Sequence, residues 1–126
     1  MRIKNQAIIN PAVDEQFLIP HPTLMQESGQ PAELGLTTAR CIRLFLNEAW
    51  KAPQPAPSFD DSAMAYELFQ AVRQSDAADF DYIEMDEEQH EWLLLSFKQL
   101  GAGIYRIHAA QILGVLGEIY EEEMAA

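Results

Sequence analysis

Glu87 and His90 have the spacing of a metal-ligating pair. Residues three apart share one face of a helix, and Glu-x-x-His is the pattern of di-iron carboxylate bundles. Such a centre needs a second Glu-x-x-His and further inward-facing glutamates, but the residue three positions before His108 is Tyr105. We therefore expect no metal and interpret Glu87 as part of a solvated helix start.

Cys41 is the single cysteine, so the chain cannot form an internal disulfide. It falls in an apolar helical stretch, where a free cysteine usually behaves as a small buried hydrophobe rather than a nucleophile. The sequence has no Gly-rich phosphate loop, no Gly-x-Ser-x-Gly elbow and no His-Glu-x-x-His pattern. We accordingly expect no catalytic residue, no cofactor and no enzymatic activity.

The segment 76–91 has the clearest asymmetry of charge, since it carries eight carboxylates and no Lys or Arg. Phe80, Tyr82 and Trp92 are interleaved with these acids or follow them. Aromatic anchors beside carboxylates would give a protein interface both affinity and electrostatic steering. The alternative is that the aromatics belong to the core and the acids form a solvated face. The predicted partner-binding residues are Asp76, Asp79, Asp81, Tyr82, Glu84, Glu87, Glu88 and Glu91.

The whole chain is strongly acidic, with 8 Lys plus Arg against 20 Asp plus Glu and a formal net charge of -12. This charge repels nucleic-acid backbones and anionic membranes, so we expect direct binding to neither. The same field attracts basic surfaces, including those that normally hold nucleic acid. A protein with a basic surface is the predicted partner, although acidity also serves solubility alone.

The elements that position these residues fall into an extended part and a helical part. Residues 1–35 contain four prolines and short apolar runs at 7–9 and 17–19, which indicate short strands or an extended arm. A helix is predicted over 36–51, because apolar residues follow helical spacing after a cap at Thr37 or Thr38. Alternate prolines at 52–57 indicate a stiff extended connector.

Residues 58–126 are predicted to form the helical core. Ser58 or Asp60 caps a second helix that ends near Ser75, and a short strand or extended segment follows at 80–85. Asp86 and Gln89 have the form of a capping box for a third, central helix, which ends at Gly101. A last helix is expected from 104 to about 124, with a fraying acidic end. Leu94, Phe97 and Ile107 are predicted core residues.

These elements predict one mainly α domain over 1–126, a compact bundle of about four helices, with α+β as the alternative. The sequence shows neither a membrane-spanning run nor a signal-peptide pattern, so we expect a cytoplasmic protein. Trp50 and the Leu-rich third helix offer apolar surface that so small a core would leave uncovered. We therefore also expect a homodimer.

The chain resembles small uncharacterised proteins of tailed phages and prophages. The resemblance lies in the order of its elements and in three stretches, Ala65 to Leu68, Ile83 to Glu88 and Ala110 to Leu113. It supplies no catalytic residues, but it implies a phage setting and the cytoplasm of a bacterial host. In that setting small acidic proteins often block host machinery or assist virion assembly.

The resulting hypothesis is a non-catalytic acidic protein that binds a basic surface of a host protein through residues 76–91 and inhibits it. Nucleic-acid mimicry or an anti-defence role would follow from this hypothesis. One alternative is an accessory protein of phage morphogenesis or tail assembly, which would bind another virion component or itself. A small metal-dependent enzyme is the remaining alternative.

Overall fold

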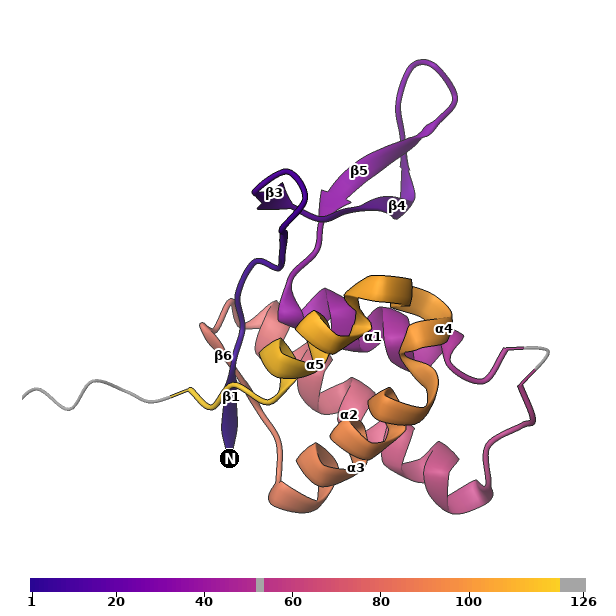
Figure 1. Ribbon diagram of the computed structural model, residues 1–126, viewed down its shortest axis with the longest axis vertical. Coiled ribbons are helices and arrows are strands. Elements are labelled where there is room, and N and C mark those ends of the chain that lie inside the picture. The colour runs from indigo at the N-terminus through magenta and orange to yellow at the C-terminus, as the bar shows by residue number, and fades with distance from the viewer. Residues whose placement is uncertain (52–53, 121–126) are drawn as a thin grey trace, which may run out of the picture.

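Capping residues set the starts of the three long helices in the computed structural model, which describes residues 1–51 and 54–120 (Figure 1). These helices are α1 (Thr38–Glu48), α2 (Phe59–Ala77) and α3 (Glu87–Leu100). The Thr37 side chain accepts a hydrogen bond from Arg40 N at 3.3 Å, and Ser58 Oγ accepts one from Asp61 N at 3.1 Å. The predicted starts are therefore confirmed.

The predicted capping box of α3 is also confirmed. Asp86 Oδ1 accepts from Gln89 N at 2.8 Å, while Gln89 Oε1 accepts from Asp86 N at 3.0 Å. Two backbone N–H groups that the helix itself cannot satisfy thus find partners, and this fixes the direction in which α3 leaves the preceding strand.

The predicted last helix from 104 to 124 is wrong. The chain instead forms α4 (Ala102–Tyr105), the 3-10 turn η1 (Arg106–His108) and α5 (Ala109–Leu116). Arg106 has a φ of 55°, which breaks the helix, and Ile107 is 89% exposed rather than buried. The predicted acidic helical end fails at 118–120, which are extended, and its residues 121–123 lie outside the described part.

Short antiparallel strands account for the N-terminal segment, as predicted. β1 (Arg2–Lys4) pairs with β6 (Tyr82–Glu84), and β2 (Ile9–Asn10) pairs with β3 (Glu15–Gln16). β4 (Leu18–Met25) and β5 (Pro31–Gly35) form a hairpin that projects from the helices (Figure 1). We call this hairpin the arm. Part of the predicted connector, residues 52–53, lies outside the described residues.

The fold is therefore α+β rather than a bundle of helices alone. Ile3 and Ile83 of the β1–β6 pair are fully buried together with Phe45 of α1 and Leu68 of α2. The strands thus belong to the same core as the helices. Phe97 is 2% exposed, as predicted, whereas Leu94 is only half-buried. Among the described residues no helix is both long and apolar enough to cross a bilayer.

Candidate functional site

The acidic segment begins where α2 ends in a left-handed turn. Asp79 N donates to Asp76 O at 3.0 Å, and Phe80 N donates to Ser75 O at 3.2 Å, which is the pair of bonds that defines a Schellman motif. Asp79 stands at the left-handed position with a φ of 57°, where glycine is usual. The turn ends the helix sharply and directs Phe80 away from its axis.

Ser75 and Asn5 hold the segment that follows against the body. The side-chain Oγ of the buried Ser75 accepts a hydrogen bond from Glu84 N at 3.2 Å, at the far end of the segment. The backbone carbonyl of Ser75 accepts the bond from Phe80 N at the near end. Asn5 N donates to Asp81 O at 2.9 Å, and Asn5 Nδ2 donates to Phe80 O at 3.3 Å. The backbone of 80–84 is therefore fixed from both sides.

The alternation of side chains along β6 divides this segment between core and solvent. Ile83 lies opposite Ile3 in the register of β1 and is fully buried. Tyr82 and Glu84 therefore take the other face of the pair, opposite Lys4 and Arg2 respectively. Residues 118–120 extend this small sheet, because Tyr120 N donates to Arg2 O at 3.0 Å.

Three aromatic rings and a guanidinium gather on the solvent side of these strands. Phe80 and Tyr82 are stacked, with ring centroids 4.9 Å apart and an interplanar angle of 13°. Tyr120 lies 5.2 Å from Tyr82, and the Arg2 guanidinium carbon lies 4.2 Å from the centre of the Tyr82 ring. Phe80 remains 44% exposed. We call this surface, with its flanking carboxylates, the acidic–aromatic face: Arg2, Asp79, Phe80, Asp81, Tyr82, Glu84 and Tyr120.

Trp92 is not part of this face. Its indole Nε1 donates to Asp61 Oδ1 at 2.9 Å, and its ring stacks on Trp50 at 5.9 Å. Trp50 also contacts Phe45, with ring centroids 6.4 Å apart. Both tryptophans are half-buried between helices, so neither serves as a surface anchor. The packing of Trp50 also removes one of the two reasons for expecting a homodimer.

The predicted partner-binding carboxylates divide into three groups. Asp76 forms an ion pair with Arg43 of α1 at 3.3 Å, so it serves the joint between α1 and α2. In the part of the chain that the structure describes, Asp79, Asp81 and Glu84 form no ion pair. The third group lies exposed in the first two turns of α3: Glu87, Glu88 and Glu91.

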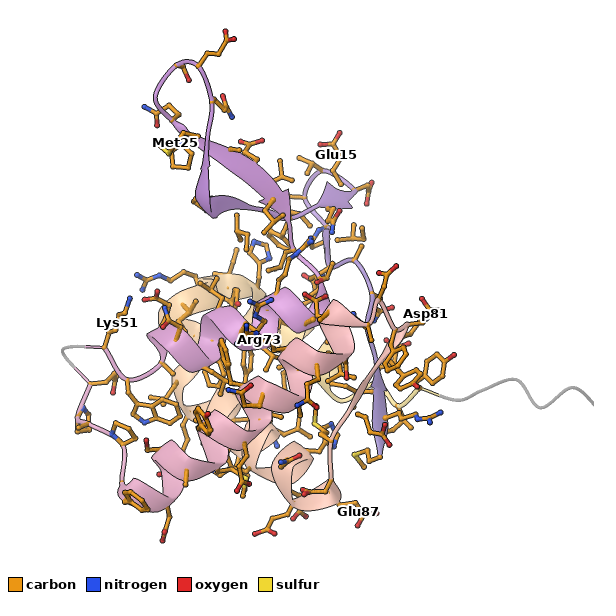
Figure 2. The ribbon with its side chains drawn as sticks, turned by 180° about the vertical axis from the view of Figure 1, so that it is seen from behind. Glu15, Met25, Lys51, Arg73, Asp81 and Glu87 are labelled. Carbon is orange, nitrogen blue, oxygen red and sulfur yellow. The ribbon has the colours of Figure 1, made fainter. Side chains whose placement is uncertain are left out.

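The charged residues labelled in Figure 2 lie on different sides of the helical body. Asp81 and Glu87 lie on one side of the helical body, at either end of the segment that contains β6, whereas Lys51 lies on the opposite side (Figure 2). Lys51 is itself paired with Glu48 at 2.9 Å, and the Arg40 guanidinium donates to Gly35 O at 2.7 Å. The side that carries Asp81 and Glu87 also contains Arg2 and Lys4 of β1, and Lys4 is paired with Glu118 at 3.7 Å.

His90 and Cys41 have structural partners. His90 is buried, and its Nε2 lies 2.9 Å from the carbonyl of Leu116, which can only accept, so Nε2 carries the proton. Over residues 1–51 and 54–120 no three His, Cys, Asp or Glu side chains gather in an arrangement that would hold a metal ion. Burial raises the pKa of the Cys41 thiol to about 12, partly offset by a hydrogen bond with Tyr105.

Sequence reasoning missed Arg2 and Tyr120. Both reach the site through pairing between segments far apart in the chain, and no local pattern reports such a pairing. The alternation of Arg2, Ile3 and Lys4 is the signal that was present, since it is typical of a strand with one buried face.

In comparisons with known proteins, the chain matches no protein family, no curated protein and no solved structure. The functional proposal therefore rests on the residues described above.

Proposed function

We propose that this chain is a non-catalytic binding protein that docks on a basic surface of another protein. The docking surface is the acidic–aromatic face together with Glu87, Glu88 and Glu91 of α3. The observation that carries the proposal is the exposed ring of Phe80, stacked on Tyr82 among carboxylates that have no ion pair in the described residues. Such a surface offers apolar contact and charge together.

The position of Asp79 supports this proposal. A left-handed conformation is costly for a residue with a side chain, and a carboxylate at the C-terminal end of a helix is disfavoured by the helix dipole. Asp79 follows the last turn of α2, which contains no basic residue. It therefore stands where it lowers stability, and binding provides a reason for keeping it there.

In the phage setting that the sequence resemblance implies, the partner is a protein of the bacterial host, and binding inhibits it by covering a surface that receives nucleic acid. An acidic surface would compete for such a site by presenting charge of the same sign as a phosphate backbone. This is the nucleic-acid mimicry, or anti-defence role, that the net charge of -12 favours.

The test compares two variants with the same change in net charge. The first reverses Glu84, Glu87, Glu88 and Glu91 to Lys. The second reverses exposed glutamates elsewhere, and these are Glu15, Glu27, Glu33 and Glu67. Each protein is used to capture partners from a bacterial lysate, and the retained protein is then purified for kinetic measurements. Circular dichroism checks that both variants are folded, because Glu87 and Glu88 also favour the start of α3.

We expect the first variant to lose the partner, chiefly through slower association, and the second to keep most of the binding. Raising the salt concentration should reproduce much of that loss in the unmodified chain, since exposed charges are screened beyond about 8 Å at 0.15 M. If both variants bind equally, or if no basic protein is retained, the proposed surface is only a solvated face.

The arm favours a second candidate function, that of an accessory protein in phage morphogenesis or tail assembly. Leu18 and Met25 of β4 are each 57% exposed, and the hairpin extends beyond the helices (Figures 1 and 2). Exposed apolar side chains on a projecting hairpin suit insertion into a neighbouring subunit. Light scattering of Leu18→Ser and Met25→Ser variants tests this role, which predicts self-association of the unmodified chain and its loss in the variants.

A further inference from the structure

We propose that the acidic–aromatic face recognises arginine in preference to lysine, so that its partner presents an arginine-bearing segment. This inference rests on the proposed function and names the chemistry of the partner. It starts from a contact within the chain itself, the Arg2 guanidinium over the Tyr82 ring at 4.2 Å. The aromatic stack thus already accepts one guanidinium group.

Phe80 offers the place for a second one. The Phe80 ring stacks on that of Tyr82, and Phe80 keeps 44% of its surface exposed. A guanidinium is flat and weakly hydrated, so it stacks on such a ring, and Phe80 would extend the sequence of contacts that runs from Arg2 through Tyr82.

The acids on either side of Phe80 complete the match. Asp79 and Asp81 are exposed, and neither forms an ion pair with a described residue. A stacked guanidinium still directs its N–H donors outward in the plane of the group, where carboxylates can accept them. An ammonium group is compact and strongly hydrated and cannot lie flat on a ring, so lysine would keep the charge interaction but gain less from the ring than arginine does.

The face is held in place before any partner arrives. Asn5 binds the carbonyl groups of Phe80 and Asp81, and Ser75 binds the amide groups of Phe80 and Glu84. Little backbone freedom remains to be lost at 80–84 on binding, which favours a specific geometry over a general attraction between charges.

The experiment measures the dissociation constants of hexa-arginine and hexa-lysine peptides for the full chain by isothermal titration at low salt. We expect hexa-arginine to bind about two- to fivefold more tightly for each stacked guanidinium. Phe80→Leu should lower the affinity for hexa-arginine more than that for hexa-lysine, so that this ratio falls to about one. Phe59→Leu is the matched control, because Phe59 is 87% exposed at the start of α2, away from this face.

The outcomes separate this inference from the proposed function. If the two peptides bind with equal affinity, the arginine preference is overturned. The acidic docking surface still stands in that case if reversal of Glu84, Glu87, Glu88 and Glu91 lowers both affinities. A preference that persists in Phe80→Leu, or that Phe59→Leu abolishes equally, also overturns the inference. Absence of binding to either peptide overturns both proposals.

Discussion

Replacing Phe97 by Ala tests how the C-terminal helices pack on the core. Phe97 is 2% exposed, and its ring centroid lies 5.0 Å from that of Phe45 and 5.8 Å from that of Tyr105. The space around the ring is full, since a Cβ on Gly101 would stand 2.7 Å from one of its carbon atoms. The loss of this ring should therefore lower the free energy of unfolding by roughly 3 to 5 kcal/mol.

The matched control is Ile107→Ala. Helical periodicity predicts a buried Ile107, yet the structure exposes 89% of it, so its truncation should change stability by less than about 0.5 kcal/mol. Thermal unfolding followed by circular dichroism measures both variants. For a chain of this size the Phe97 variant should melt roughly 10 to 20 °C lower. An equal loss in both variants would show that the break at Arg106 is wrong and that the helix continues.

Three further predictions concern single side chains. Cys41 should resist alkylation in the folded chain at pH 8, because burial raises the pKa of its thiol to about 12, and it should react once urea unfolds the protein. Rapid labelling of the folded chain would contradict the burial. Between pH 9.0, the ordinary pKa of the thiol, and about pH 12, its pKa in the folded chain, the thiol is ionised only in the unfolded chain. The free energy of unfolding should therefore fall as the pH rises through this range, relative to that of Cys41→Ala. Asp61→Ala should cost about 1 kcal/mol and shift tryptophan fluorescence, because Trp92 Nε1 loses its acceptor, whereas Asp61→Asn keeps one. Asp79→Gly should raise the free energy of unfolding, measured in urea, by roughly 0.5 to 1 kcal/mol. This gain should be larger than that of Asp79→Asn, which removes only the charge. A lower free energy of unfolding in Asp79→Gly would argue against the left-handed turn.

Local chemistry explains which parts of the fold the sequence could predict. The caps at Thr37, Ser58 and Asp86 each bind a backbone amide three residues ahead, so a short stretch of sequence contains all the information for the helix start. The end of the chain differs. Glu118 and Tyr120 are extended because β1 binds their backbone, and helical periodicity does not report a partner so far away in the sequence.

The candidate site follows the same division. The run of carboxylates is visible in the sequence, but whether each aromatic side chain is buried or exposed depends on which elements pack against it. Phe80 and Tyr82 lie on the solvent side because β1 pairs with β6 and directs Ile83 inward. Trp92, only ten positions after Tyr82, turns toward Trp50 because it lies on the face of α3 that meets α2 and the end of α1. Composition alone cannot separate these cases.

The pairing of β1 with β6 and with residues 118–120 also determines when the acidic–aromatic face comes into existence. During synthesis β1 leaves the ribosome before α1 and α2, so it waits unpaired until β6 follows them, and residues 118–120 emerge only after α3. Closing so long a loop is slow compared with the formation of α1 or α2, and this makes the sheet a late event in folding. A nascent or truncated chain that lacks residues 118–120 would thus have helices but no complete binding face, so that binding is acquired only with the finished fold.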